Sequence, residues 1–145
     1  MVALYIVIGE NRKRIKEEFI NQGAVFQKTD EEPSPDDLFL KQAMECVHQH
    51  LDDSDYDREA FAADMGASSS KLYNKLRALT GMNVSSFIRD IRLKEAMRMA
   101  KQNPQLRVSD LAYSVGFKDP KYFATCFKKE FGVQPSEYIE SLSKD

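Results

Sequence analysis

The pattern of hydrophobic and polar positions predicts helices along most of the chain. Apolar residues recur at helical spacing over residues 38–51 and again over residues 87–100. We expect Asp36 or Asp37 to cap the first helix and Asn83 to cap the second, because short polar side chains accept hydrogen bonds from the free N–H groups of a first turn. After residue 37 no segment shows the period of two that is typical of a strand.

The first part of the chain has a different pattern. Residues 10–21 predict a short amphipathic helix that is too small to fold alone. Residues 29–37 combine two prolines with an acidic run, which is typical of an extended linker. We therefore divide the chain into an N-terminal extension (1–28), an acidic linker (29–37) and a helical domain (38–142).

The helical domain contains an internal repeat. Residues 61–66 (Phe-Ala-Ala-Asp-Met-Gly) correspond to residues 111–116 (Leu-Ala-Tyr-Ser-Val-Gly) at an offset of fifty, and the match continues at an offset of fifty-one. Each copy has a short helix ending at a glycine and a second helix starting at an N-cap residue. These residues are Gly66 and Ser68 in the first copy, and Gly116 and Asp119, followed by Pro120 at the first helical position, in the second.

This arrangement predicts two helix-turn-helix units, around residues 57–80 and 107–131. The inward-facing stripe of each second helix is Leu72, Leu76 and Leu79 in the first unit and Phe123, Phe127 and Phe131 in the second. About twenty helical residues between the units span roughly 30 Å. That length is close to the roughly 34 Å between successive major grooves on one face of B-DNA, so one chain is expected to reach two grooves.

The net charge of the whole chain does not indicate a DNA partner, but the charge of its C-terminal part does. The whole chain has a net charge of -2. Residues 30–64 hold twelve acidic and two basic residues, whereas residues 65–145 hold eight acidic and fourteen basic residues. The C-terminal part is therefore a basic unit behind an acidic one, as expected of a phosphate-binding surface.

The outward faces of the two second helices carry side chains that suit a major groove. Asn pairs with adenine, hydroxyls bond to base edges, and the methyl groups of Ala and Thr contact thymine. These candidates for base contact are Ser70 and Asn74 in the first unit and Ala124 and Thr125 in the second, where the neighbouring Lys121 is expected to hold the DNA backbone. The position of Tyr73 and Tyr122 beside the apolar stripe favours partial burial. Candidates for phosphate contact are Ser68, Lys71, Lys75, Arg77, Arg89, Arg92, Asp119, Lys128 and Lys129.

Three separated blocks resemble the AraC/XylS family of bacterial transcription regulators. They are residues 87–93 (Phe-Ile-Arg-Asp-Ile-Arg-Leu), residues 115–123 and residues 127–138, and the resemblance covers about residues 38–142. It implies an all-α domain of seven helices with two helix-turn-helix units on a long central helix. It also implies base contacts by Ser70, Tyr73 and Asn74, and by Lys121, Ala124 and Thr125. RNA polymerase is then an expected partner besides operator DNA.

The basic segment 11–19 is similar to the helix that joins a phosphorylation receiver domain to an AraC-type output in hybrid two-component sensors. If that is its origin, the chain is a fragment with the receiver domain upstream. A piece of a plain response regulator and a small free-standing regulator are the alternatives. The operator, the controlling signal, the oligomeric state and the choice between activation and repression are not encoded in any pattern that we identify.

Other functional classes find little support. No Ser/His/Asp, Cys/His or paired-carboxylate arrangement predicts an enzyme or a cofactor site. His48 and His50 point to different faces of a helix, and Cys46 and Cys126 lie far apart, so we expect neither a metal site nor a disulfide. The apolar run 2–8 is too short for a membrane span or signal peptide, so we expect a cytoplasmic protein. A helical module that binds another protein is the main rival hypothesis.

Overall fold

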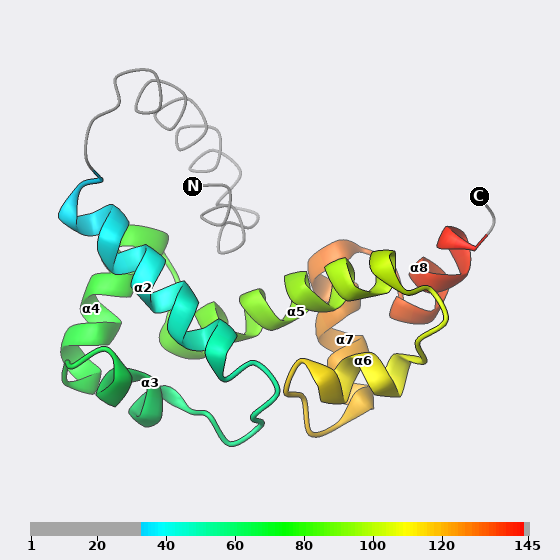
Figure 1. Ribbon diagram of the computed structural model, residues 1–145, viewed down its shortest axis with the longest axis horizontal. Coiled ribbons are helices and arrows are strands. Elements are labelled where there is room, and N and C mark those ends of the chain that lie inside the picture. Colours follow the sequence, from blue (N-terminus) through cyan, green and yellow to red (C-terminus); the bar gives the residue numbers. More distant parts are fainter. Residues whose placement is uncertain (1–32, 144–145) are drawn as a thin grey trace. The chain divides into compact units, whose positions relative to one another are not determined.

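The computed structural model describes residues 33–143. Within that range the chain forms seven α-helices and no strand (Figure 1), which confirms the predicted all-α class. The helices are α2 (Pro35–Gln49), α3 (Arg58–Asp64), α4 (Ser69–Thr80), α5 (Val84–Gln102), α6 (Val108–Ser114), α7 (Pro120–Phe131) and α8 (Pro135–Leu142). The predicted helix over residues 10–21 and the start of the linker lie outside the described residues. None of the described helices is both long and apolar enough to cross a membrane.

The described residues form two compact units. Unit 1 consists of residues 33–49 and 58–90, and unit 2 consists of residues 50–57 and 91–143. Unit 1 contains α2, α3 and α4, unit 2 contains α6, α7 and α8, and α5 contributes to both. Each unit therefore holds one of the two predicted helix-turn-helix pairs, α3–α4 and α6–α7.

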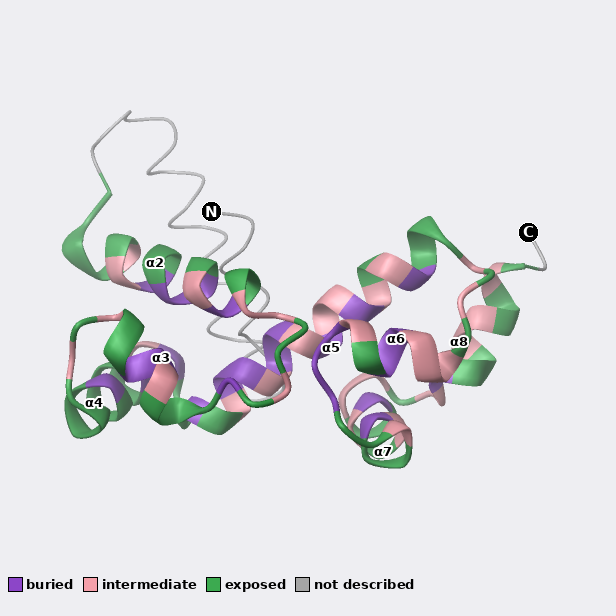
Figure 2. Ribbon diagram, turned by 60° about the horizontal axis from the view of Figure 1, so that its bottom comes forward, coloured by how far each residue is buried: buried purple, intermediate pink, exposed green. Residues whose placement is uncertain are grey.

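Unit 1 buries Leu72 and Leu76 of the predicted stripe of α4, whereas Leu79 is half-buried. Leu72 and Leu76 of α4 are completely buried, as are Phe61 of α3 and Phe87 of α5, whose rings stack with centroids 5.8 Å apart. Figure 2 shows the buried residues on the faces of α2, α3 and α4 that turn toward one another. Burial of each such side chain contributes roughly 1.5–3 kcal/mol, so this contact surface fixes α4 with its opposite face outward.

Unit 2 has a more aromatic core. Phe123 and Phe127 of α7 are buried, and Phe117 meets Phe123 edge-on with a centroid distance of 5.2 Å. Phe131 is only half-buried, and its ring packs edge-on against that of Phe127 with a centroid distance of 4.6 Å. The predicted inward stripe of α7 is thus confirmed, and edge-to-face pairs of this kind add about 0.5–1.5 kcal/mol each beyond burial.

The observed starts of α4, α5 and α7 agree with those predicted from the sequence. The Ser68 hydroxyl accepts a hydrogen bond from the Lys71 amide (3.2 Å), and the Asp119 carboxylate accepts one from the Lys121 amide (3.0 Å). Pro120 is the first residue of α7, and the Asn83 side chain caps α5 by accepting from the Ser86 amide (2.8 Å). Both second helices therefore begin at the residues that were predicted to start them.

The start of α2 differs from the prediction. The helix begins at Pro35, inside the segment expected to be linker, and its cap is Ser34. The Ser34 hydroxyl accepts from the Asp37 amide (3.1 Å), while the Asp37 carboxylate accepts from the Ser34 amide (3.3 Å). This reciprocal pair is a capping box with Pro35 at the first helical position. Asp37 takes part from the third position, and neither predicted residue is the cap itself.

The loop between α2 and α3, residues 50–57, belongs to unit 2. The Arg92 guanidinium donates from Nη2 to the backbone oxygen of Asp53 (2.8 Å). Lys118, in the turn between α6 and α7, forms an ion pair with Asp55 of the same loop (2.8 Å). Gly116 has φ +88°, and any side chain there would strike the Leu51 carbonyl oxygen. The turn of the second helix-turn-helix pair is therefore packed against this acidic loop.

Candidate nucleic-acid interface

The outer face of α4 is polar and open to solvent. Ser70, Asn74 and Arg77 are exposed on the side opposite Leu72 and Leu76. Ser68 caps the helix, so the first-turn N–H groups lie at the same end of α4 as Ser70, whereas Arg77 lies in the last turn. A helix presented in this way offers amide, hydroxyl and guanidinium groups to the edges of base pairs.

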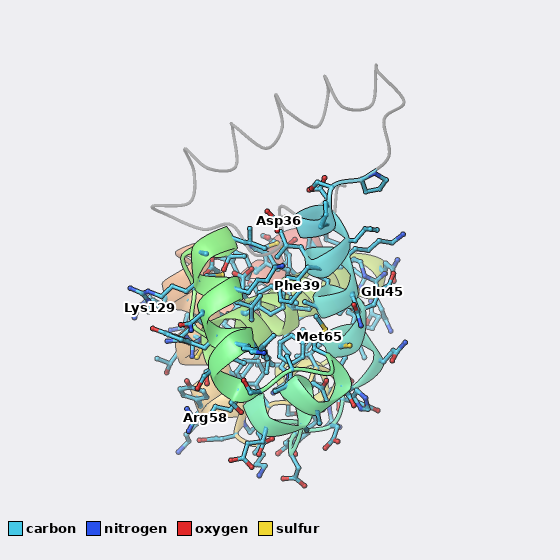
Figure 3. The ribbon with its side chains drawn as sticks, turned by 90° about the vertical axis from the view of Figure 1, so that its left-hand side faces the viewer. Asp36, Phe39, Glu45, Arg58, Met65 and Lys129 are labelled. Carbon is cyan, nitrogen blue, oxygen red and sulfur yellow. The ribbon has the colours of Figure 1, made fainter. Side chains whose placement is uncertain are left out.

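The corresponding face of α7 is richer in lysine. Lys121, Lys128 and Lys129 are exposed, and Ala124 is half-buried. Figure 3 shows Lys129 projecting away from the ribbon. The exposed Thr125 donates its hydroxyl hydrogen to the Lys121 carbonyl oxygen (3.1 Å), so its methyl group is the part most suited to contact with a base. The face of α7 therefore supplies positive charge and methyl groups, and fewer donors for base edges than that of α4.

The two tyrosines are more exposed than their position beside the apolar stripe suggested. Tyr73 is 39% exposed and Tyr122 is 52% exposed. The Tyr122 ring packs at a tilt against Phe117 with a centroid distance of 6.0 Å, which anchors one edge of the ring. Tyr73 therefore stays available as a contact residue beside Ser70 and Asn74 on α4.

One predicted phosphate-binding lysine faces its own unit. The Lys75 ammonium lies 5.1 Å from the centre of the Phe39 ring and 3.8 Å from an oxygen of Asp36. Both partners belong to α2, which lies alongside α4 (Figure 3). An exposed cation–π contact contributes about 0.5–1 kcal/mol and an exposed ion pair about 0–1 kcal/mol, so the two together bias the side chain toward α2. Lys71, one turn earlier, is exposed.

The two arginines predicted on α5 also have internal contacts. Arg92 is half-buried, donates to the backbone of residue 53 and lies against Gly116. Burial lowers the pKa of Arg92, and the nearby Asp53 carboxylate acts in the opposite direction. Arg89 donates to the Ser86 hydroxyl (3.2 Å) on its own helix. The structure thus gives Arg92 a role inside unit 2, and we do not carry it into the proposed interface.

Ser68 and Asp119 have their side chains committed to capping. Any contact of these two positions with phosphate is therefore expected from the backbone N–H groups of the first turn and not from the side-chain oxygens. For Asp119 this distinction matters, because a carboxylate repels a phosphate.

Sequence reasoning missed a group of residues beside α4. Arg58, Ser69 and Ser85, together with Ser70 and Tyr73, line one open pocket of unit 1. The sequence feature that could have indicated this pocket is Arg58, which is one of only two basic residues in the acidic segment 30–64. Within the described residues, no cluster of side chains suited to a metal ion is present.

Comparison with known protein families shows which family the chain belongs to. A family described as "Helix-turn-helix domain" matches residues 61–141, which begin within α3 and end within α8 and so extend across both helix-turn-helix pairs. The chain belongs to the AraC-type helix-turn-helix family. It is therefore a DNA-binding domain of a transcription regulator, in a family that is in general not enzymatic.

Relatives of this AraC-type domain are larger proteins. The "Arabinose operon regulatory protein" of Escherichia coli is 31% identical over 104 residues, covering 72% of this chain and 35% of that protein. "Histidine kinase P4" of Formosa agariphila is 37% identical over 135 residues, covering 93% of this chain and 10% of the kinase. The chain thus spans a tenth of the kinase and about a third of the arabinose regulator.

A solved structure shares the fold of this AraC-type domain. The C-terminal domain of AraT, a response regulator from Geobacillus stearothermophilus, superposes with a TM-score of 0.65 at 25% identity. The superposition covers 77% of this chain and 88% of the AraT domain.

Proposed function

We propose that this domain binds specific duplex DNA sequences by inserting α4 and α7 into the major groove. The observation that carries the proposal is the duplicated geometry. Each of these helices has 12 residues, a side-chain N-cap, a glycine C-cap in the left-handed region and an exposed polar face. A second helix held by a buried stripe, with its first turns outward, is the arrangement that enters a groove in helix-turn-helix proteins.

The two helices are proposed to divide the work of recognition. In unit 1, Ser70, Tyr73 and Asn74 contact base edges, and Lys71 and Arg77 contact phosphates. In unit 2, Lys121, Ala124 and Thr125 contact bases, while Lys128 and Lys129 contact phosphates. Because Ala124 has no polar group and the Thr125 hydrogen is already donated, we expect most sequence discrimination to come from unit 1.

The central helix supports a proposal about the operator. The 19 residues of α5 correspond to about 28 Å of helix. One chain is then long enough to place α4 and α7 in successive major grooves, which are about 34 Å apart on one face of the duplex. An operator of this kind has two contacted segments about one helical turn apart.

We further propose that the domain is the output of a two-component signalling protein. The similarity to a histidine kinase over 93% of this chain and the shared fold with a response-regulator domain support this proposal. A phosphorylation receiver domain is then the upstream partner, and RNA polymerase is the partner when the protein is bound at a promoter.

A fluorescence-anisotropy titration with a labelled duplex at several salt concentrations tests DNA binding. Neutralisation of six to ten phosphates lowers affinity by about 10³–10⁵ between 50 and 200 mM salt. We expect a steep decline of this kind, with tighter binding to a selected duplex than to a scrambled one. A folded protein with weak, salt-independent affinity for every duplex would instead support a protein-binding module.

A further inference from the structure

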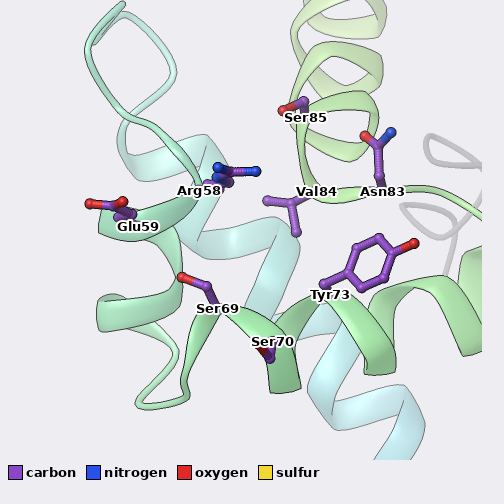
Figure 4. Close-up of a pocket in the computed structure, with 8 residues that line it drawn as sticks. All are labelled: Arg58, Glu59, Ser69, Ser70, Tyr73, Asn83, Val84 and Ser85. Atoms are coloured by element: carbon purple, nitrogen blue, oxygen red, sulfur yellow. The ribbon is translucent and has the colours of Figure 1, made fainter.

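Unit 1 contains an open pocket beside the recognition helix (Figure 4). Its volume is about 510 Å³, and it lies among the first turns of α3, α4 and α5. The lining residues are Arg58, Glu59, Ser69, Ser70, Tyr73, Asn83, Val84 and Ser85. Two of them, Ser70 and Tyr73, also belong to the proposed base-contacting face of α4. Whatever fills this pocket therefore lies next to the occupant of the groove.

The chemistry of the pocket favours an anion. In Figure 4 the guanidinium of Arg58 points toward Val84 and Ser85, whereas the carboxylate of Glu59 points the other way. Ser69 and Ser85 add hydroxyl groups, and both are exposed. A guanidinium with hydroxyl donors is a group of side chains that commonly binds phosphate oxygens. Positive charge is thus directed inward and negative charge outward.

The same lining disfavours a small apolar ligand. Pockets for such ligands are lined mainly by aliphatic and aromatic side chains. Here Val84 is the one aliphatic residue and Tyr73 the one aromatic residue among the eight. The pocket is open, and Ser70 and Tyr73 of its lining also belong to the exposed face of α4 that a duplex is expected to approach. A phosphate on a polymer can enter from that side without being enclosed.

We infer that this pocket holds a backbone phosphodiester of the bound DNA, on the strand that borders the groove occupied by α4. Arg58 supplies the charge, and the hydroxyls of Ser69 and Ser85 donate hydrogen bonds to the phosphate oxygens. The free N–H groups in the first turns of α4 and α5 add to the same field. This inference rests on the proposed function, and it adds a contact that fixes the depth and angle of α4 in the groove.

The test compares Arg58→Ala with wild type and with Arg98→Ala as a matched control. Arg98 is an exposed arginine paired with Glu95 on α5, away from the pocket lining and the proposed contacts. We expect Arg58→Ala to reduce the slope of log affinity against log salt by about 0.9, equally for matched and scrambled duplexes, and Arg98→Ala to leave it unchanged. Ser85→Ala should also weaken binding uniformly across sequences through the loss of a hydrogen bond, and because it changes no charge it should leave the salt slope unaltered.

Duplexes with single neutral methylphosphonate linkages then locate the phosphate. One linkage should lower the affinity of wild type about tenfold or more and that of Arg58→Ala hardly at all, because the charge-assisted contact is already missing. An equal penalty in both proteins at every linkage, or an unchanged salt slope for Arg58→Ala, would overturn the inference while leaving DNA binding intact. Wild-type protein without any salt-dependent duplex affinity would overturn the proposed function itself.

Inorganic phosphate distinguishes a free anion from the DNA backbone. If millimolar phosphate raises the melting temperature of wild type but not of Arg58→Ala, and the salt slope for DNA is the same in both, the pocket binds a free anion and the inference is wrong. If phosphate has no such effect and the slope changes as expected, the phosphodiester is the occupant.

Discussion

Gly116 lies directly against the carbonyl oxygen of Leu51, with no room for a side chain between them. Its backbone has φ +88°, and an added Cβ would also lie 2.9 Å from the guanidinium carbon of Arg92. Gly132, in the same unit, has a similar φ of +79° but nothing within 4 Å of an added Cβ. The two glycines thus separate the effect of backbone conformation from the effect of close packing.

Gly116→Ala is expected to destabilise unit 2 more than Gly132→Ala. Both substitutions force alanine into the left-handed region, at about 1–2 kcal/mol. Gly116→Ala adds overpacking against a backbone carbonyl, which costs roughly 1–3 kcal/mol more because backbone atoms cannot move aside as a flexible side chain does. Urea unfolding of the two variants measures the difference. Equal losses of stability would show that the loop is not held against this turn.

Lys71 and Lys75 are one turn apart on α4, yet we expect different contributions to DNA binding. Lys75 is held near Asp36 and Phe39, whereas Lys71 is exposed. Lys71→Met should lower the slope of log affinity against log salt by about 0.9, the value for one phosphate contact. Lys75→Met should change it much less and should slightly lower the stability of unit 1. Identical slopes for the two variants would contradict this assignment.

The ion pair between Asp55 and Lys118 makes a prediction about pH. The hydrogen bond and charge of Lys118 lower the pKa of Asp55, and Asp55 raises the pKa of Lys118. Because the pKa of Asp55 is lower in the folded state, the pair stabilises the fold at pH values above the ordinary aspartate pKa of about 3.9. This stabilisation is lost as the pH falls through the lower pKa of the folded state. In an NMR titration the Asp55 carboxyl should titrate below 3.9 in wild type and shift upward in Lys118→Met. Coinciding titration curves would rule the pair out in solution.

Asn74 and Lys129 test the division between base and phosphate contacts. Asn74→Ala should cost about 1–3 kcal/mol on the preferred duplex and relax the preference at particular base pairs, because a bidentate amide contact is lost. Lys129→Ala should weaken binding to all duplexes by a similar factor and lower the salt slope. Parallel titrations against a matched duplex and against single base-pair variants separate the two effects. Identical profiles for the two variants would refute the division.

The features that could be predicted from the sequence are local or repeated. Ser68, Asp119 and Pro120 determine where α4 and α7 begin through bonds to their own first turns, so their effect is visible in a few residues of sequence. The buried stripes follow from the 3.6-residue period in the same way. The capping box of α2 is local in the same sense, because Ser34 and Asp37 have the spacing of such a box in the sequence.

The features that the sequence did not indicate depend on contacts between distant residues. Arg92 is drawn inward by a backbone carbonyl 39 residues earlier, and its residue type alone does not distinguish this contact from one with phosphate. Lys75 is held by α2 in the same way. The pocket that contains Arg58 forms where the first turns of α3, α4 and α5 meet, and none of these segments alone indicates a binding site. Such placements arise from how the helices pack, and a single sequence contains no direct signal for them.

Footprinting on a selected duplex tests the central claim most directly. Duplexes that bind the domain are enriched from a random pool, and the tightest is probed with a reagent that modifies guanines in the major groove. We expect two protected segments with centres 10–10.5 base pairs apart, one lost in Asn74→Ala and the other in Lys121→Ala. A single protected segment that both substitutions weaken equally, or no protection at all, would contradict binding by two recognition helices.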